Sequence, residues 1–501
     1  MDGQSDGPVV PANLPNVANA AEVGEERGPA KGNTGSETPA GRSVGTGVSN
    51  GLDRVRQVAQ RDRRAQFTAL LHHVDLGLLW RSYREVNPRA KPGVDEVTWG
   101  EYGIDLEAKL RDLRERVQQG RYRAVPARRV YIPKADGRLR PLGIASLEDK
   151  VVQRAVVEVL GSVYEEDFKN FSYGFRPGRG PHDALDALSV GLWQKRVNWV
   201  LDADISDFFG SLDHDCLRRF LQHRIADPRV LRLIDKWLAV GVVEDGVWTS
   251  SAKGSPQGAS LSPLLGNVYL HYVFDLWADY WRKTRADGDV IIVRFADDVV
   301  VGFEHEQEAR QFLAELRERF AQFGLALHPE KTRLIEFGRH AARRRAQRGM
   351  GKPETFDFLG FTHICGKSRK GGNFWVKRIT IAKRMRAKLK QVKIDLMRWR
   401  HQPVPVQAKW LRSVIQGHLN YYAVPGNRAA IRQFRTLAVR HWFRALRRRS
   451  QRARKLNWTM MNRYVNHWLP PVRTLHEFPN VRLKANNPRQ EPSAVVPLAG
   501  I

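Results

Sequence analysis

Two adjacent aspartates, Asp297 and Asp298, interrupt an otherwise apolar stretch of the chain. The flanking runs 291–295 and 299–303 are rich in β-branched residues, which predicts two buried strands joined by a tight turn. Two carboxylates this close repel each other, so the pKa of one rises unless a cation neutralises them. Mg²⁺ does so by binding one or two carboxylates together with substrate phosphates. The stretch therefore indicates either a divalent-cation site or a plain Asp-rich turn.

A second pair of aspartates lies in the segment 198–209, which reads NWVLDADISDFF. Period-two alternation places Asp202 and Asp204 on the same face of a predicted strand. A carboxylate near the end of a largely apolar strand needs a partner, and a metal ion is the simplest one. Strand alternation does not choose between the two aspartates.

Two further segments carry basic residues in turns. Segment 128–144 predicts a hairpin whose turn is flanked by Lys134 and Arg140, a pair that can clamp a triphosphate or can be a solvated hairpin edge. Segment 171–185, FSYGFRPGRGPHDAL, places Arg176 and Arg179 among aromatic residues and glycine–proline turns. That composition favours a loop that binds a nucleic-acid strand. The alternative is an ordinary surface loop.

The composition points to a polyanionic partner. Lysine plus arginine number 83 and aspartate plus glutamate 53, a net charge of +30, and phosphates are the natural partner of such a surface. The only cysteines, Cys216 and Cys365, are far apart and offer no cysteine zinc site. We expect no membrane span and no signal peptide, hence a cytoplasmic, nucleic-acid-associated protein.

The pattern along the chain predicts several folded regions. Residues 1–52 are poor in large apolar groups and are expected to be disordered. Apolar spacing predicts helices over 57–83, 106–117, 147–164 and 304–323. From about Ala382 to Lys455 basic and aromatic residues interleave along helical segments, as a nucleic-acid groove requires. Residues 481–501 are expected to form a flexible tail.

Together the carboxylates predict a reaction class. One strand-end aspartate and one Asp–Asp hairpin can share two divalent ions about 3.5–4 Å apart. One ion would activate a 3′-hydroxyl and the other would hold a departing pyrophosphate. This arrangement carries out phosphoryl transfer by in-line displacement, and polymerases are among its users.

The same residues resemble a known family, the group II intron-encoded reverse transcriptases or maturases. The resemblance covers roughly 53–482, and its blocks occur in the family's order. They read VYIPKADGRLRPLGI, SYGFRPGRGPHDAL, DADISDFFGSLDH, GSPQGASLSPLLGNVYL, FADD, LHPEKT, FDFLGF and QGHLNYYAVPGN.

The resemblance implies an α+β right-hand polymerase. Fingers and palm, an antiparallel sheet with helices, would occupy 53–370, and an α-helical thumb or maturase domain 375–480. The implied function is RNA-directed DNA synthesis with two Mg²⁺ ions during intron mobility, together with binding of the intron RNA to assist splicing. The implied partners are group II intron RNA, an RNA template with a DNA primer, dNTPs and target DNA.

The resemblance also assigns roles to residues of the palm. It implies that Asp204, rather than Asp202, is the metal ligand on the strand, assisted by the Ile205 carbonyl. Asp297 and Asp298 would complete a catalytic triad. Phe209 stands where the family excludes a ribose 2′-hydroxyl.

Further positions follow for the substrates. Gln257 would lie beside the templating pair, Lys134 and Arg140 would hold the incoming triphosphate, and Lys331 would lie near the primer or the triphosphate. Beyond the palm, the densely basic run 441–455 supplies the nucleic-acid-binding arginines that we expect in the thumb. They are Arg444, Arg447, Arg448 and Arg449.

The chain departs from the family pattern in three places. The usual tyrosine of the YADD box is Phe295, which keeps the packing and loses a hydroxyl. Asp207 stands where many relatives carry glycine or lysine. The cysteine-rich endonuclease module of some relatives is missing. Two alternatives stay open, an RNA-binding splicing cofactor with little or no polymerase activity, and a reverse transcriptase of another lineage such as a retron or defence enzyme.

Overall fold

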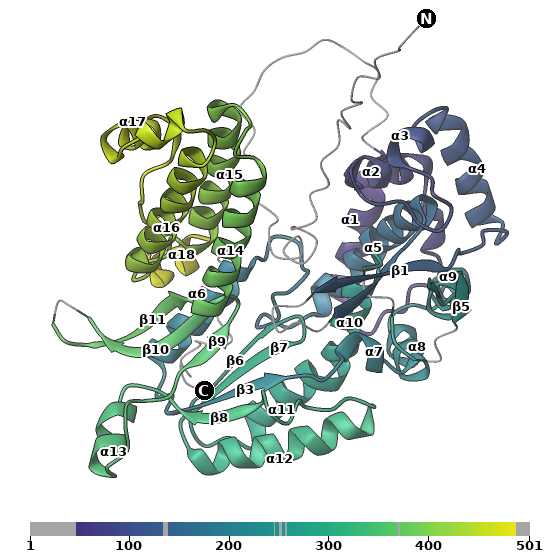
Figure 1. The fold of residues 1–501 in the computed structure, drawn as a ribbon. Helices are drawn as coiled ribbons and strands as arrows, with labels where there is room; N and C mark the ends of the chain where they lie inside the picture. Colours follow the sequence, from purple (N-terminus) through teal and green to yellow (C-terminus); the bar gives the residue numbers. More distant parts are fainter. Residues whose placement is uncertain are drawn as a thin grey trace, which may run out of the picture.

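The computed structural model describes residues 47–133, 139–244, 246–249, 253–255, 258–368 and 371–486 (Figure 1). Helices and predominantly antiparallel sheets occupy separate parts of the chain, so the predicted α+β class is confirmed. In Figure 1 the N-terminal helices and the C-terminal helices stand on opposite sides, and a sheet formed by the middle of the chain lies below and between them.

The N-terminal helices pack around one long central helix. They are α1 (Gly47–Arg61), α2 (Leu76–Glu85), α3 (Trp99–Tyr102), α4 (Leu106–Gln118) and the central α5 (Leu147–Asp167), with the short 3₁₀ turn η1 (Leu71–His73) before α2. Leu52 and Val55 of α1 are buried. The prediction of disorder through residue 52 is therefore wrong for 47–52, which begin the first helix.

The predicted single helix over 57–83 is wrong, because tertiary contacts divide it. Phe67 forms a parallel bridge with Ile225, and the buried Asp227 carboxylate accepts hydrogen bonds from the backbone of Leu70 (2.8 Å) and Leu71 (3.0 Å). Those amides are consequently not free to continue a helix. Asp75 then caps α2 by accepting from the Leu78 amide.

A four-stranded sheet in the order β2-β1-β4-β5 projects beside these helices. Its strands are β1 (Ala127–Pro133), β2 (Leu139–Ile144), β4 (Val242–Glu244) and β5 (Val247–Thr249). β1 and β2 pair antiparallel, with Ile132 opposite Arg140. The hairpin predicted over 128–144 is thus confirmed for its two strands, while its turn lies outside the described residues.

The palm sheet has the order β6-β7-β3-β8 and is antiparallel throughout. Its strands are β3 (Trp199–Asp204), β6 (Val290–Phe295), β7 (Asp298–Phe303) and β8 (Arg333–Glu336). β6 and β7 are almost wholly buried, since helices cover both faces of the sheet. Burial on both faces explains why these strands read as continuous apolar runs rather than as alternating ones.

Short helices complete the palm and fingers. They are α6 (Pro181–Gln194), α7 (Phe208–Ser211), α8 (His214–Gln222), α9 (Pro228–Ala239), α10 (Ser262–Leu270), α11 (Leu276–Thr284), α12 (Glu306–Gln322) and α13 (Ala341–Gln347), with a π-helical turn η2 (His271–Asp275) between α10 and α11. The helices predicted over 106–117, 147–164 and 304–323 correspond to α4, α5 and α12.

The C-terminal part has a hydrophobic core of its own. A three-stranded sheet, β9 (Phe356–Phe358), β10 (Phe361–Lys367) and β11 (Phe374–Thr380), leads into α14 (Ala382–Arg398), α15 (Val404–Tyr422), α16 (Arg428–Arg447) and α17 (Trp458–Trp468). Helix therefore begins at 382, and residues 375–380 are strand. No helix within the described ranges is long and apolar enough to cross a membrane.

The last described helix, α18 (Pro479–Asn486), returns to the palm. Arg482 pairs there with Asp183 (2.8 Å) and Asp186 (3.0 Å) of α6. The prediction of a flexible tail from 481 is therefore wrong for 481–486, and 487–501 lie outside the described residues.

His363 makes the stability of this fold sensitive to acid. The ring is fully buried in β10 and stacks on Phe356 with centroids 4.7 Å apart. Burial, with a smaller contribution from Arg378, lowers its pKa to about 3. Because the unfolded chain takes up this proton near pH ~6.5, the stability that the neutral ring contributes is present above that value. It is lost as the pH falls toward about 3, at roughly 1.4 kcal/mol per pH unit.

We expect His363→Phe to retain more stability at mildly acidic pH than the wild type, because its unfolded chain has no imidazole at this position to be stabilised by taking up a proton. Denaturant unfolding at neutral and at mildly acidic pH measures this difference. Phe356→Leu controls for altered packing and should lower stability equally at both values. An unchanged pH dependence in His363→Phe would contradict the assignment.

Candidate active site

Strand pairing brings the predicted aspartates together at one end of the palm sheet. Asp204, the last residue of β3, lies directly opposite Asp298, the first residue of β7. Asp297 and Ala296 form the two-residue turn between β6 and β7, because Phe295 pairs with Asp298. The turn is therefore shorter by one residue than the three-residue polar step that the sequence suggests. The three carboxylates come from the paired strands β3 and β7 and from the turn that joins β6 to β7.

The register distinguishes Asp204 from Asp202. Asp202 lies opposite Val300, and its carboxylate faces Arg333 of β8 at 3.6 Å. Asp204 instead lies beside the hairpin, where Lys331 Nζ donates to its Oδ2 at 2.8 Å. The geometry thus favours Asp204 as the partner of the Asp–Asp turn.

Asp297 experiences the electrostatic conflict that the sequence suggests. Its pKa is raised, first by burial and then by the negative charge of Asp204. The positive charges of Arg140 and Arg294 act in the opposite direction. The positive charge of Arg140, on β2, therefore acts on the Asp297 carboxylate.

A buried arginine supports the Ala296–Asp297 turn. Arg294 of β6 is fully buried, and its Nη1 donates to the carbonyl of Ala296 at 3.0 Å. Ala296 has a φ of 56°, a left-handed conformation that costs energy for any residue with a Cβ. The guanidinium therefore fixes a strained turn whose next residue is Asp297.

Two further side chains hold Arg294 in place. Asp275 of η2 accepts two hydrogen bonds from the guanidinium, at 2.7 and 2.6 Å. Asn267 of α10 accepts a third at 3.0 Å and donates its own amide to the Gly174 carbonyl at 2.7 Å. We call Arg294, Asp275 and Asn267 the Arg294 clamp.

The loop 171–176 lies against the same turn. The Tyr173 amide donates to the Arg294 carbonyl, and the Arg294 amide donates to the Phe171 carbonyl, both at 2.8 Å. A Cβ on Gly174 would lie only 2.3 Å from the backbone nitrogen of Ala296, so no other residue fits without movement. The clamp thus ties the turn to a neighbouring loop and to two helical segments.

Sequence reasoning missed the Arg294 clamp. The available signal was a single arginine within the apolar run VIIVRF, since a charged residue is almost never fully buried unless it is paired. Its partners Asp275 and Asn267 lie 19 and 27 residues away in sequence, and nothing in the block that contains Asn267 links it to an arginine of a distant strand.

Arg176 has a structural role in place of the nucleic-acid contact that the sequence predicts. It is buried, pairs with Glu165 at 3.0 Å, and donates to the carbonyls of Lys169 and Ser172. Burial lowers its pKa to about 10. Its hydrogen-bonding groups are thus used inside the loop.

Arg179 is only half-buried, and one of its nitrogens donates to the Asn170 carbonyl at 2.6 Å. Phe175, by contrast, is exposed, has a left-handed φ of 57° and lies 6.5 Å from the ring of Phe295. Phe175 therefore exposes an aromatic ring near Phe295, which directly precedes the Ala296–Asp297 turn.

Phe209 lies in α7, five residues after Asp204. Its ring packs edge-on against Phe208, with centroids 5.1 Å apart, and its carbonyl accepts from the Ser255 amide at 2.8 Å. Gly266 of α10 leaves the space that both rings fill. A half-buried, rigidly packed ring is suited to limiting the volume of a substrate beside it.

These features agree with the comparisons with known proteins. Residues 132–363 match the family described as reverse transcriptase (RNA-dependent DNA polymerase). The chain is 37% identical over 220 residues to protein YkfC of Escherichia coli (strain K12), covering 40% of this chain and 57% of YkfC. Residues 132–363 thus match a reverse transcriptase domain, and the chain is also similar to a group II intron-encoded protein.

Two relatives carry names that refer to introns. The group II intron-encoded protein LtrA of Lactococcus lactis subsp. cremoris is 38% identical over 166 residues, 33% of this chain and 27% of LtrA. Nuclear intron maturase 3, mitochondrial, of Arabidopsis thaliana is 31% identical over 129 residues, 26% of this chain and 18% of that protein. The chain thus spans between about a fifth and three fifths of these relatives' lengths.

Within the reverse transcriptase domain, two predicted substrate residues, Lys134 and Gln257, lie outside the described residues. Arg140 and Lys331 are both exposed; Arg140 lies on β2, and Lys331 lies two residues before β8. Ile205, whose carbonyl is a predicted metal ligand, follows Asp204 and has a buried side chain.

Asp207, which departs from the family pattern, adopts a left-handed φ of 39°. Its carboxylate occupies the space where a Cβ of residue 210 would lie, and Gly210 leaves that space free.

Reverse transcriptases generally use Mg²⁺, and the donor chemistry of this domain fits a hard cation. Asp204, Asp297 and Asp298 offer only oxygen atoms, and the repulsion that raises the pKa of Asp297 is relieved by a positive charge. In the described part of the chain, no three carboxylate, imidazole or thiol groups already converge as a metal site. Lys331 instead supplies the positive charge beside Asp204.

The predicted thumb arginines lie at the end of α16 and just after it. Arg444, Arg447 and Arg448 are exposed, and Arg449 is half-buried and donates to the His401 carbonyl at 3.3 Å. Arg447 also stacks over Phe443. These side chains extend from a helix end that is anchored by the thumb core.

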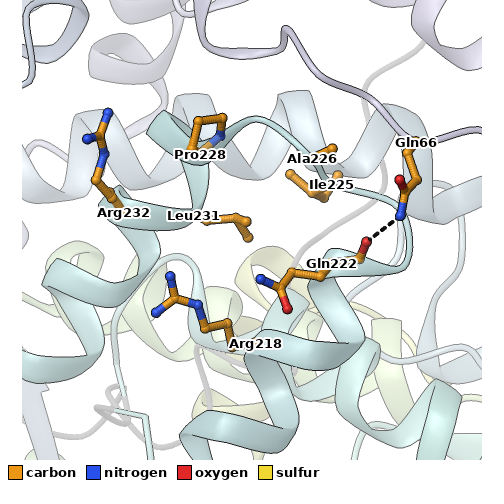
Figure 2. Close-up of a pocket in the computed structure, with 8 residues that line it drawn as sticks. All are labelled: Gln66, Arg218, Gln222, Ile225, Ala226, Pro228, Leu231 and Arg232. Atoms are coloured by element: carbon orange, nitrogen blue, oxygen red, sulfur yellow. Dashed lines mark hydrogen bonds between the residues drawn. The ribbon is translucent and has the colours of Figure 1, made fainter.

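The reverse transcriptase domain also has a pocket of about 490 Å³ that contains none of the predicted site residues (Figure 2). It lies between α8 and α9, with an apolar floor of Ile225 and Leu231 and two arginines, Arg218 and Arg232, on its rim. Arg218 pairs with Asp235 at 3.0 Å. The pocket holds no carboxylate, histidine or thiol that could act on a substrate.

Proposed function

We propose that this chain is an RNA-directed DNA polymerase encoded by a group II intron, which copies the intron RNA into DNA. The observation that carries the proposal is the strand register that places Asp204 opposite Asp298 and beside Asp297. The family match and the intron-related relatives support the same activity.

In this proposal the three aspartates hold two Mg²⁺ ions, with the Ile205 carbonyl as a further oxygen ligand. When bound, such ions activate the 3′-hydroxyl of the primer and stabilise the departing pyrophosphate. The protein's own contribution is positioning. Arg140 approaches from the fingers, and its guanidinium can bind a phosphate through two parallel hydrogen bonds.

Three further residues complete the proposed substrate site: Lys331, and Lys134 and Gln257, which lie outside the described ranges. The Lys331 ammonium lies 2.8 Å from Asp204, so it is within reach of phosphates bound at that carboxylate. Lys134 would assist Arg140 on the triphosphate, and Gln257 would lie beside the templating base pair.

Phe209 is proposed to select dNTPs over ribonucleotides. We expect Phe209→Val to increase ribonucleotide incorporation roughly tenfold or more, because the smaller side chain leaves room for a 2′-hydroxyl. The dNTP reaction should change much less. Single-nucleotide extension with a dNTP and its matched rNTP measures the ratio. An equal change with Phe208→Val, which alters the buried neighbouring ring, would contradict a specific role for Phe209.

The second part of the proposal is binding of the excised intron RNA to assist its splicing. The basic surface over 382–455, with Arg444 and Arg447–Arg449 at one end, is the proposed RNA contact in the thumb. The proposed setting is the bacterial cytoplasm, where intron RNA, target DNA and dNTPs meet. A splicing cofactor with little polymerase activity is less favoured, since it would not need three mutually repelling carboxylates.

Primer extension on an RNA template with dNTPs and Mg²⁺ tests the proposal. The wild-type chain should extend a DNA primer, and a chelator should stop it. No extension under any metal condition, with tight RNA binding retained, would leave the splicing cofactor and overturn the polymerase.

A further inference from the structure

A strongly basic element projects from the palm between β8 and β9. Residues 337–353, which include α13, contain five arginines and one lysine but no aspartate or glutamate. In Figure 1, α13 extends away from both the fingers and the thumb helices. Neither the triad nor the thumb arginines account for this concentration of charge.

After Phe337, which is fully buried in the core, the fold gains little apolar burial from this element. Ala341 is its only buried helical residue. Two of its arginines, Arg344 and Arg348, share the single buried carboxylate of Glu336. Like charges four residues apart on a helix destabilise it, and a helix of seven residues is marginal by itself.

Four cations remain after that pairing. Arg339 donates to the Trp193 carbonyl at 3.1 Å, and we call the other three, Arg343, Arg345 and Lys352, the α13 patch. None has a carboxylate partner in the described part of the chain, and Arg345 makes only a hydrogen bond from its Nε to the Gly351 carbonyl, at 3.3 Å. Arg343 and Lys352 are exposed. Glu336 therefore anchors the helix through its neighbours and leaves the patch directed outward.

The α13 patch is separate from the catalytic end of the palm. Glu336, from which the element departs, pairs with Trp199 at the start of β3, whereas Asp204 ends that strand. Five residues of strand correspond to roughly 17 Å. The primer terminus held at the aspartates therefore lies at the other end of the sheet.

We propose that the α13 patch binds the phosphate backbone of double-helical RNA, at a site distinct from the template in the catalytic cleft. The chemistry is charge-based, because arginine forks and a lysine ammonium match phosphate oxygens. Proteins that hold single strands add aromatic platforms for the bases, and residues 338–353 contain no Phe, Tyr or Trp. Folded RNA offers the duplex backbone that such a surface fits. This inference rests on the proposed function in one respect: the duplex would belong to the structured intron RNA that the chain is proposed to bind.

The test compares two triple variants with the same loss of charge. Arg343→Gln/Arg345→Gln/Lys352→Gln removes the patch, and Arg111→Gln/Arg114→Gln/Arg121→Gln removes three cations from and just beyond α4 in the fingers. Binding of a labelled, blunt-ended RNA duplex is measured over a range of salt concentrations. Each phosphate contact contributes about 0.7–0.9 to the slope of log affinity against log salt. We expect the patch variant to lose about two to three from this slope and the control variant to lose less than one.

Further measurements separate this site from the polymerase and from a folding defect. Primer extension by the patch variant on a short template should equal that of the wild type, since the cleft is unchanged. Arg343→Lys/Arg345→Lys should bind duplex RNA as the wild type does. The proposal would be overturned if the two triple variants had equal slopes, or if the lysine variant lost binding. It would also be overturned if the patch variant lost affinity for duplex DNA and not for duplex RNA. A wild type without polymerase activity would refute the proposed function while leaving the binding comparison intact.

Discussion

Replacing Asp297 with alanine is expected to reduce RNA-templated DNA synthesis by about 10³-fold or more. Loss of one neutral hydrogen-bond donor at a developing oxyanion costs about 10²–10³ in rate, and a ligand for a divalent ion has a larger electrostatic effect. Asp204→Asn should be similarly inactive, because its strand position places it in the same group of carboxylates. Primer extension under single-turnover conditions measures both.

The folding of Asp297→Ala should be unimpaired or improved. In the wild type, burial and the charge of Asp204 raise the pKa of Asp297, which means that its ionised form is unfavourable in the folded protein. Removing this carboxylate relieves the repulsion. An inactive variant that unfolds at an equal or higher denaturant concentration would therefore show that function, and not stability, was lost.

Asp202→Asn is the matched control. Asp202 lies on the same strand, two residues before Asp204, but faces Arg333 at 3.6 Å. An amide oxygen can still accept from that arginine, so synthesis should stay within a few-fold of the wild type. Inactivity of Asp202→Asn with full activity of Asp204→Asn would show that the assignment of the two aspartates is reversed.

The sequence indicates the candidate carboxylates clearly, because they stand out from the local periodicity of the strands that carry them. A strand repeats every two residues, and its apolar runs mark β3, β6 and β7 within a few positions. The strand order β6-β7-β3-β8 cannot be predicted from local periodicity, because it depends on pairing between residues far apart in the chain. The choice between Asp202 and Asp204 depends on that register, and the residues alone leave it open.

Long-range contacts also explain where the predictions fail. Nothing between residues 57 and 83 breaks a helical pattern, and the break comes from Asp227, whose carboxylate binds the amides of Leu70 and Leu71. The sequence suggests that Arg176 is a surface arginine next to aromatic residues. In the structure it is buried, and it is bound by the Glu165 carboxylate and by two backbone carbonyls of the preceding segment. Charge in a sequence therefore indicates a partner without showing whether that partner is nucleic acid or the protein itself.

The Arg294 clamp leads to the second prediction. Removing Arg294 alone leaves the Asp275 carboxylate buried and unpaired, which would cost several kcal/mol of stability, about 3–5 for such pairs. The double variant Arg294→Met/Asp275→Leu avoids this, because a buried ion pair replaced by apolar residues of similar volume is often neutral or stabilising. The double variant should fold, but it lacks the hydrogen bond to the Ala296 carbonyl.

We expect this double variant to lose about 10²-fold in the rate of synthesis, because a displacement of about 1 Å at the reacting groups is enough for such a loss. The KM for dNTP should change little, since Arg140 and Lys331 are untouched, whereas the Mg²⁺ concentration for half-maximal activity should rise. Asp275 and Arg294 do not touch the substrate, so this split between kcat, KM and metal requirement distinguishes positioning from a general structural defect. Asn267→Ala, which leaves the ion pair intact but removes the link to Gly174, should show the same split with a smaller loss. Wild-type synthesis and metal dependence in the double variant would mean that the strained turn holds Asp297 in place without the clamp.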